Sequence, residues 1–353
     1  MGYQVMRGVG TTGVVGLLTG AQRGERTVLL RFDMDALPIQ EENEVPYRSQ
    51  TAGVMHACGH DAHVAAGLGV AKLLVRHQAE LPGTVKLMFQ PAEEIIEGAE
   101  AMIADGVLEQ PHVDVALGLH VSSMVPLGTA VVHSGPLLAG GDLFEIVVRG
   151  RGGHGAQPHE TIDPVVVAGH IIVALQSIVS RNVNPEEMGV VTIGSIHAGQ
   201  AGNVIADTVT MSGTIRSFNR EVHLLLRRRI EELVTGVTAA FGAQADLTIS
   251  MAVEPTINAP GPSAVVERVA GEILGVQQID TMGRTMAGED FSAVLARIPG
   301  NFFFLGAGNA ALGLNHPHHS AHFDIDEACL PAGVAILCEA AVRCLRGEGE
   351  SAR

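Results

Sequence analysis

Residues 62–89 read AHVAAGLGVAKLLVRHQAELPGTVKLMF, in which a helical pattern over Ala62–His77 leads into a short apolar strand at Thr84–Phe89. A buried strand is expected before this unit at Thr27–Phe32, and another follows it at Val113–Leu119. Apolar strands that alternate with helices are typical of a mostly parallel sheet covered by helices on both faces. The first part of the chain therefore predicts an α/β domain built on a mixed, mostly parallel sheet.

The pattern of elements changes near Gly140-Gly141. Six elements are expected from there to Pro255: strand Leu143–Val148, helix Ile162–Val179, strands Gly189–Ile196 and Thr208–Arg216, helix Glu221–Phe241 and strand Ala245–Met251. Their order, β-α-β-β-α-β, is that of the ferredoxin-like arrangement. A small α+β domain is therefore expected at 141–252.

The α/β pattern returns after this segment, with helices expected at Ala264–Leu274 and Cys329–Leu345 and a strand at Phe302–Leu305. Because the two flanking segments share one pattern, an inserted domain is the economical explanation. We therefore expect residues 1–140 and 253–353 to form one discontinuous domain around the insertion.

The composition excludes several classes of protein. The 353 residues are 46% hydrophobic, which is enough for packed cores, and the formal net charge is −16. A chain this acidic repels phosphates, so no nucleic acid partner is expected. The four cysteines are too scattered for a disulfide framework. Since no secretory signal is recognisable and no apolar run approaches the ~20 residues that cross a bilayer, we expect a cytoplasmic protein without a membrane partner.

The stretch His56–His63, HACGHDAH, holds the first candidate metal ligands. In extended backbone, side chains two residues apart project to the same side, so Cys58 and His60 could bind one metal ion or two adjacent ones. The alternative is a loop with a buried cysteine and histidines at the start of a helix.

Further candidates come directly after predicted strands. Glu93 and Glu94 follow the strand Thr84–Phe89, and His120 follows Val113–Leu119. Ligand sites of open α/β sheets gather outside the carboxyl ends of strands, so these positions converge on one edge of the sheet. Taken singly, the glutamates could be a solvated acidic turn and the histidine a structural residue, but their repetition at successive strand ends favours a site.

The histidine-rich stretch His316–His322 has four histidines in seven residues, which suits metal binding better than a core. Thiolate, imidazole and carboxylate ligands together fit Zn²⁺ or another borderline divalent metal. Two such ions held ~3.5–4 Å apart would polarise a carbonyl and acidify a water. Glu93 could then take a proton from that water and pass it to a leaving amine.

Five motifs in order resemble one metallohydrolase family. They are Arg31–Pro38 (RFDMDALP), Met55–His63 (MHACGHDAH), Pro91–Glu94 (PAEE), Gly118–His120 (GLH) and Gly150–His154 (GRGGH). The family contains hippurate hydrolases, N-acyl-amino-acid amidohydrolases (aminoacylases) and plant auxin-conjugate hydrolases, and the resemblance covers nearly the whole chain. It implies an amidohydrolase that acts on an N-acyl amino acid or a peptide-like substrate with two divalent ions (Zn, Mn, Co or Ni).

The resemblance also implies an architecture. The segments 1–140 and 253–353 would form the metal-binding catalytic domain, and 141–252 would form a lid or dimerisation domain. A homodimer or higher homo-oligomer is expected through the inserted domain.

Carried over position by position, the resemblance implies the metal ligands Cys58, His60, Glu94, His120 and His319. His319 is chosen because His319–Asp324 (HSAHFD) resembles the family's His-x-Pro-x-aromatic-Asp stretch. Ala321 stands where the family usually has proline, so His318 remains an alternative.

Other residues acquire expected roles in the same way. Glu93 matches the general base, Asp35 a carboxylate that orients a histidine ligand, and His154 a residue that stabilises the tetrahedral oxyanion across a dimer or after domain closure. Asn203 and Arg216 resemble residues that contact the substrate. The motif Glu289-Asp290-Phe291 also has a counterpart in the family, although a helix cap explains it about as well.

Two other functions fit parts of the sequence. One is a cysteine hydrolase with Cys58 as nucleophile and His60 or His120 as base, in which Glu93 and Glu94 have no obvious role. The other is a homologue that binds metal and acyl-amino acids without turnover.

Overall fold

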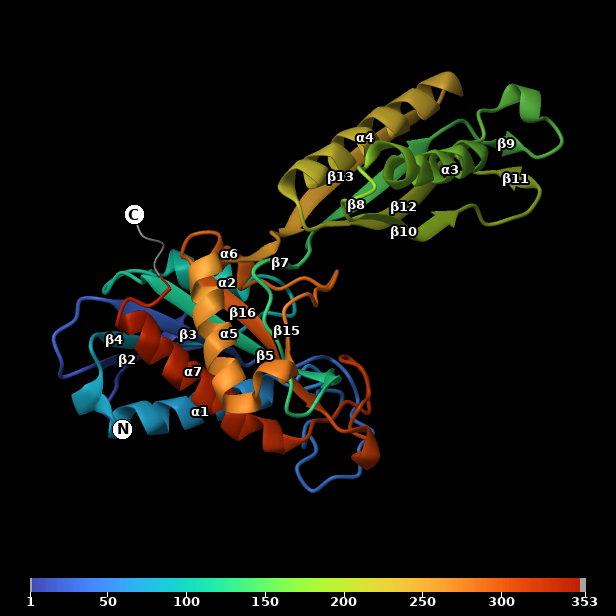
Figure 1. Ribbon diagram of the computed structural model, residues 1–353. Helices are drawn as coiled ribbons and strands as arrows, with labels where there is room; N and C mark the ends of the chain where they lie inside the picture. Colours follow the sequence, from blue (N-terminus) through green and yellow to red (C-terminus); the bar gives the residue numbers. More distant parts are fainter. Residues whose placement is uncertain (1, 350–353) are drawn as a thin grey trace. The chain divides into compact units, whose positions relative to one another are not determined.

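The computed structural model describes residues 2–349, apart from the side chains of residues 251 and 252. The chain divides into two compact units (Figure 1). The first comprises Met1–Leu137, Thr256–Arg284 and Glu289–Arg353, and the second comprises Leu138–Pro255 and Thr285–Gly288. The predicted division into a catalytic domain and a lid or dimerisation domain stays a prediction.

The first unit is built on an eight-stranded sheet in the order β1-β2-β4-β3-β5-β16-β6-β15. Its strands are β1 Gln4–Val9, β2 Gly13–Thr19, β3 Thr27–Asp33, β4 Thr84–Gln90, β5 Val115–Pro126, β6 Ala130–Val131, β15 Ile279–Asp280 and β16 Gly300–Gly308. The central strands β4, β3, β5 and β16 are parallel, whereas the pairs β1–β2, β2–β4 and β16–β6 are antiparallel. The prediction of a mixed, mostly parallel sheet is confirmed.

Helices cover both faces of this sheet. They are α1 His60–Arg76, α2 Gly98–Ala104, α5 Pro260–Leu274, α6 Ser292–Leu295 and α7 Leu330–Leu345. Every residue of β3 is buried, and its alternate residues point to opposite faces. Phe32 belongs to the apolar core that residues of α1, α5 and α7 form with the sheet, and these three helices pack beside one another (Figure 1). Arg31 points to the other face and contacts Asp290, which precedes α6 and accepts a hydrogen bond from Ala99 of α2.

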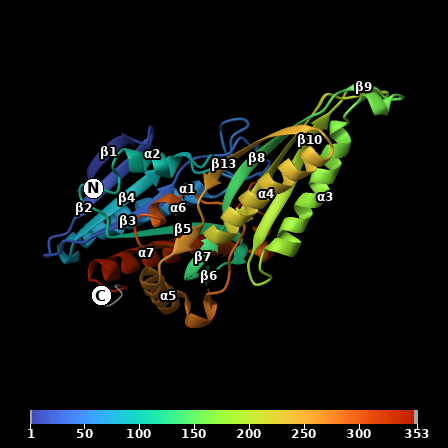
Figure 2. The same ribbon diagram turned by 90° about the horizontal axis from the view of Figure 1, so that it is seen from above.

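The second unit has a four-stranded antiparallel sheet in the order β10-β12-β8-β13. Its elements are β8 Gly140–Arg149, β9 Gly153–His154, α3 Pro164–Asn182, β10 Gly189–Ala198, β11 Val204–Ile205, β12 Thr208–Ser217, α4 Arg220–Ala240 and β13 Gln244–Val253. The two helices lie side by side (Figure 2) and pack Leu175 and Leu226 into one core with Ile146 of β8. The larger elements follow the predicted β-α-β-β-α-β order.

Two helices contradict the expectation that no apolar segment is long enough to cross a membrane. Pro164–Asn182 and Glu327–Leu345 each have 19 residues, with mean hydropathies of 1.5 and 1.7. Both supply core residues to their own units, such as Ile171 from α3 and Ile336 from α7. Since core helices of globular units pass the same test of length and composition, the pair is weak evidence for a membrane.

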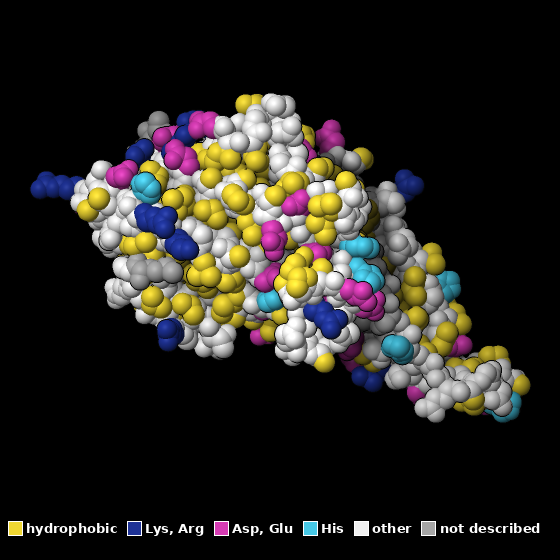
Figure 3. Space-filling view, turned by 90° about the horizontal axis from the view of Figure 1, so that it is seen from below, with side chains coloured by type: hydrophobic (Ala, Val, Ile, Leu, Met, Phe, Trp, Pro, Cys, Tyr) yellow, Lys and Arg dark blue, Asp and Glu magenta, His cyan; other side chains and the backbone are white. Residues whose placement is uncertain are grey.

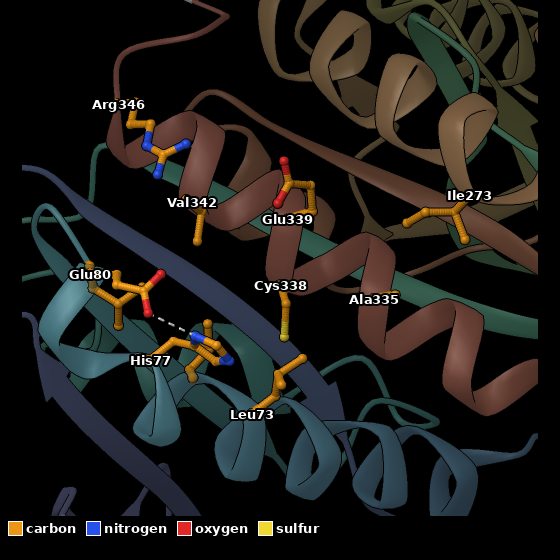
Figure 4. A pocket seen from close by; sticks show the side chains of 11 residues that line it. Leu73, His77, Glu80, Ile273, Ala335, Cys338, Glu339, Val342 and Arg346 are labelled. Atoms are coloured by element: carbon orange, nitrogen blue, oxygen red, sulfur yellow. Dashed lines mark hydrogen bonds and ion pairs between the residues drawn. The ribbon is translucent and has the colours of Figure 1, made fainter.

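An apolar groove of about 450 Å³ lies between α1 and α7 (Figure 4). Leu73 and Cys338 line it, and Ile273 of α5 lies at its edge. Leu73 and Ile273 are 37% and 39% exposed, and Figure 3 shows that hydrophobic side chains are spread over the visible face of the molecule. None of the candidate site residues lines the groove, so it is separate from the site described below.

Candidate metal centre

The candidate ligands of the first unit meet at the carboxyl ends of three neighbouring strands, β4, β3 and β5. Cys58 precedes α1 and His60 is its first residue, while Glu93 and Glu94 follow β4. His120 lies inside β5 rather than after it, because this strand continues beyond its predicted end. The structure therefore brings together these five residues, which the sequence placed in separate motifs.

Gly59 sets the position of the loop between Cys58 and His60. Its φ is 83°, and a Cβ there would lie 2.6 Å from Cγ2 of Val121 in β5. Only glycine combines a left-handed backbone with the missing side chain that this approach requires. The two ligand candidates on either side of Gly59 are therefore held against β5.

Among the described residues, four groups of side chains could hold a metal ion, including Asp33 with His60, His63 and His120, and two of the four groups share Cys58. Cys58, His60 and Glu94 form one of these two, and Cys58, His120 and His318 form the other. The Cys58 Sγ lies 3.5 Å from His120 Nε2, and His60 Nε2 lies 3.9 Å from Glu94 Oε1. Because these two groups share Cys58, two ions held by them would be neighbours.

Two atoms of the group of Cys58, His60 and Glu94 have no hydrogen-bond partner among the described residues. They are His60 Nε2 and Glu94 Oε1, and both are buried. A buried polar atom without a partner costs ~1–3 kcal/mol, so native proteins rarely keep one without a ligand for it. The imidazole, thiol and carboxylate around these atoms are the ligand types of borderline divalent metals. The residues present therefore fit a metal ion.

Asp35 fixes the orientation of two of these candidates. Its Oδ1 accepts a hydrogen bond from His60 Nδ1 at 3.1 Å, and its Oδ2 accepts one from the Glu94 backbone N–H at 3.0 Å. This arrangement leaves the His60 Nε2 lone pair free to face the cluster. Burial lowers the pKa of His60, but the carboxylates of Asp33 and Asp35 outweigh that effect and raise it to about 9.

The structure places both His318 and His319 at the cluster. His318 Nδ1 lies 3.6 Å from Cys58 Sγ, and burial lowers its pKa to about 4. His319 Nε2 lies 3.4 Å from Glu94 Oε2, on a residue with a left-handed φ of 64°. The choice of His319 over His318 stays a prediction, since each contacts a different candidate ligand.

Glu93 lies in a crowded group of acids. Its carboxylate, Glu289 and Asp290 lie within 4.8 Å of one another, and its Oε2 lies 4.0 Å from His60 Nε2. Burial, followed by the charge of Glu289, raises the pKa of Glu93 to about 10. A nearby cation would lower that pKa and favour the carboxylate form.

Sequence reasoning missed three buried residues at this site. Asp33 contacts His63 and lies 3.4 Å from His60 Nε2, and Arg31 binds Asp33 at 2.6 Å. Arg31 also binds Glu289 at 2.7 Å, and Glu289 accepts a hydrogen bond from the Phe291 N–H just before α6, so the Glu289 motif contributes to the cluster. The alternation of side chains along β3 could have indicated two of them, because residues 31 and 33 lie on one face of the strand at its carboxyl end.

The remaining candidates lie in the second unit. His154 and Asn203 are exposed neighbours at the paired strands β9 and β11, where the Gly155 N–H donates to the Asn203 carbonyl at 2.9 Å. Arg216 lies near the other end of β12, opposite Gly141 of β8. Within this unit, the structure brings His154 and Asn203 together and keeps Arg216 apart.

Comparison with known proteins identifies relatives along the whole chain. The family model described as "Peptidase family M20/M25/M40" matches residues 29–343. N-acetyl-L-cysteine deacetylase of Bacillus subtilis is 40% identical over 350 residues, which are 99% of this chain and 82% of that protein. IAA-amino acid hydrolase ILR1-like 4 of Arabidopsis thaliana is 40% identical over 351 residues, 98% of this chain and 78% of that protein.

A solved structure agrees with these relatives. The YXEP protein of Bacillus subtilis, described as a dinuclear metal binding peptidase from the M20 family, has a TM-score of 0.84 and 34% identity. The match covers 98% of this chain and 88% of that one. With the candidate clusters described above, these findings confirm the predictions of an amide hydrolase and of metal cofactors. The chain is a member of peptidase family M20/M25/M40.

Proposed function

We propose that this protein hydrolyses the amide bond of N-acyl amino acids or similar small amides at a two-metal centre. The observation that carries the proposal is the pair of buried atoms His60 Nε2 and Glu94 Oε1, which lie 3.9 Å apart and have no hydrogen-bond partner among the described residues. The proposed ligands are Cys58, His60, Glu94, His120 and His319, with His318 as the alternative to His319. The names of the deacetylase and of the auxin-conjugate hydrolase support an acylated amino acid as substrate.

Glu93 is the proposed general base. Divalent cations held by these ligands would supply Lewis acidity, which would polarise an amide carbonyl and acidify a water. Glu93 lies beside His60 and is only 7% exposed, so its carboxylate can take a proton from water without competition from bulk solvent. The protonated Glu93 can then donate to the leaving amine. Asp35 keeps His60 and Glu94 in place during these transfers.

We propose that residues of the second unit act on the substrate. His154 would donate to the developing oxyanion, and Asn203 beside it would contact the acyl oxygen. Arg216 would bind the substrate carboxylate. A homodimer, in which His154 acts across the subunit boundary, remains part of this proposal.

The alternative of a Cys58 nucleophile is less well supported. Reactive cysteines have a lowered pKa, whereas burial and the nearby carboxylate of Glu94 raise the pKa of the Cys58 thiol. A cysteine in this environment suits a metal ligand better than a free thiolate.

Reconstitution of chelated protein with Zn²⁺, Mn²⁺, Co²⁺ or Ni²⁺ tests the proposal, with release of amino acid from N-acetyl and N-benzoyl amino acids as the readout. Activity should depend on metal, and Glu93→Gln should lower kcat by about 10²–10⁴-fold. The exposed Glu97 serves as the matched control, so Glu97→Gln should keep full activity. Turnover that survives complete chelation, or an active Glu93→Gln variant, contradicts the proposed mechanism.

A further inference from the structure

A buried chain of polar contacts connects three elements beside the metal centre. It begins at Arg31 and Asp33 of β3, passes through His63 of α1 and ends at the backbone of Val121 in β5. Arg31, Asp33 and His63 are each no more than 1% exposed. None of the three is among the proposed ligands, and the general base is a different residue.

The hydrogen bonds of His63 determine which of its ring nitrogens carries the proton. The Val121 N–H donates to Nε2 at 2.9 Å, so Nε2 must be the unprotonated nitrogen. Nδ1 then carries the hydrogen and donates it to Asp33 Oδ1. The His63 ring is therefore neutral. It accepts a hydrogen bond from the backbone of β5 and donates one to a carboxylate of β3.

The backbone of Val121 also forms a hydrogen bond with a second histidine. The Nδ1–H of His120 donates to the Val121 carbonyl at 2.7 Å, which leaves His120 Nε2 facing Cys58 Sγ at 3.5 Å. One residue thus anchors both rings, since its N–H binds His63 and its C=O binds His120. The rings of His63 and His120 lie edge to face with centroids 4.6 Å apart.

At the other end, Arg31 balances the charge of the carboxylates. It binds Asp33 at 2.6 Å, Glu289 at 2.7 Å and Asp290 at 3.2 Å, and its Nε donates to Gln90 at 3.0 Å. A carboxylate buried as deeply as Asp33 needs such a partner. Asp33 in turn lies 3.4 Å from His60 Nε2, so the same carboxylate contacts both histidines of α1.

We infer that Arg31, Asp33 and His63 form a positioning frame. By this we mean a set of buried contacts across β3, α1 and β5 that fixes the positions of His60 and His120 relative to each other. His63 is the central positioning residue, because its two ring nitrogens join the Asp33 carboxylate to the backbone of the strand that carries His120. The inference rests on the proposed metal centre, and it adds residues that determine how well that centre is pre-organised. Partners that orient metal ligands typically affect metal affinity by ~10–100-fold.

Two substitutions separate the two contacts of His63. In His63→Asn the amide nitrogen lies near the position of Nδ1, so it keeps the donor to Asp33 and loses the acceptor for Val121. In His63→Gln the amide oxygen can reach the position of Nε2 and keep that acceptor. His223→Gln is the matched control, since His223 is a buried histidine of the second unit whose Nε2 lies 2.8 Å from Asp142 Oδ2.

Titration of the chelated proteins with Co²⁺ and Zn²⁺ measures the effect. We expect His63→Asn to bind metal ~10–100-fold more weakly, to change the visible spectrum of the Co²⁺ form, and to lower kcat with little change in KM. His63→Gln should recover most of the affinity, and His223→Gln should match wild type. Wild-type affinity and spectrum in His63→Asn would overturn the inference.

Hydrogen exchange of the Val121 amide in chelated protein gives a readout that needs no metal. Its N–H donates to His63, so it should be protected in wild type and His63→Gln and should exchange faster in His63→Asn. If His63→Asn does not fold, an unprotected Val121 amide in a folded His63→Gln variant refutes the frame. A wild-type chain that binds no metal but shows the expected exchange pattern would overturn the proposed function and leave the frame standing.

Discussion

At the residue scale, the centre contains buried charged side chains and residues with left-handed backbone, whereas a protein core normally contains apolar side chains in regular backbone. Arg31 and Asp33 are fully buried, and Ala92 and His319 have left-handed φ values of 57° and 64°. Strained residues of this kind cost ~1–3 kcal/mol each and persist where the surroundings determine them, as at functional sites. Both left-handed residues lie within one position of a proposed base or ligand.

Gly59→Ala is expected to destabilise the protein and to weaken metal binding. The new Cβ would lie 2.6 Å from Val121 Cγ2 on a residue with φ of 83°. Gly53 has a similar φ of 73° with no atom within 4 Å, so Gly53→Ala measures the backbone strain alone. Urea unfolding should show a cost for Gly59→Ala that exceeds that of Gly53→Ala by about 1–3 kcal/mol. Equal costs would mean that the loop moves away from β5 without penalty.

His319→Ala is expected to weaken metal binding more than His318→Ala does. The reason is that His319 Nε2 approaches Glu94 Oε2, the carboxylate oxygen of Glu94 that does not face His60. Competition with a chelator measures both affinities. The opposite order would assign the last ligand to His318, which contacts Cys58.

Part of the site was predictable because its residues follow strands. Glu93 and Glu94 stand at a strand end that the hydrophobic pattern already located. The choice between His318 and His319 was not predictable from the sequence, since it depends on a single left-handed residue in a loop. His63 was missed for another reason: its role arises from a contact with Val121, 58 residues away, and no local pattern encodes that pairing.

At the element scale, the strands and helices with a buried face were predictable. β3 and β4 agree with the predicted strands to within one residue at each end, and α1 begins two residues early and ends one early relative to the expected helix. The hairpin of β1 and β2 was not expected. β1 is mostly exposed, so it has no apolar face that a periodicity could reveal.

His154→Ala should separate chemistry from metal binding. His154 lies on β9 in the second unit, whereas the proposed ligands all lie in the first. We expect kcat to fall by about 10²–10³-fold, as for loss of an oxyanion donor, with metal affinity unchanged. His159, which is exposed in the following turn, provides the control: His159→Ala should keep wild-type kcat. A fall in metal affinity for His154→Ala would assign this histidine a different role.

At the scale of the whole molecule, stability is linked to the charge state of the centre. The pKa of His60 is raised from 6.5 to about 9 by Asp33 and Asp35 against the effect of burial, and that of Glu93 from 4.5 to about 10 by burial and Glu289. A group with a raised pKa binds more protons in the folded state. Its contribution to stability is complete below the unfolded pKa and is lost as the pH rises through the folded pKa.

Chelated protein should therefore become less stable between pH 6.5 and 8. Burial lowers the pKa values of His63, His120 and His318, so those groups oppose this trend mainly at and below the lower edge of the window. Burial also raises the pKa of Glu289 to about 7, which reinforces the trend. Urea unfolding at both pH values measures the change. Metal-loaded protein should show the reverse trend, because ligands must lose protons to bind metal and affinity rises with pH. A chelated protein that gains stability over this range would contradict the assignment.

The Arg31 cluster also limits how the sequence can vary. Removing one member of a buried ion pair typically costs ~3–5 kcal/mol, whereas replacing the whole group with apolar residues is often neutral. Arg31 joins β3 to Glu289 and Asp290, more than 250 positions away along the chain. Substitutions at these three positions should therefore be inherited together, and a chimaera that takes β3 from one homologue and residues 289–290 from a divergent one should fold poorly even though each segment folds well in its own parent.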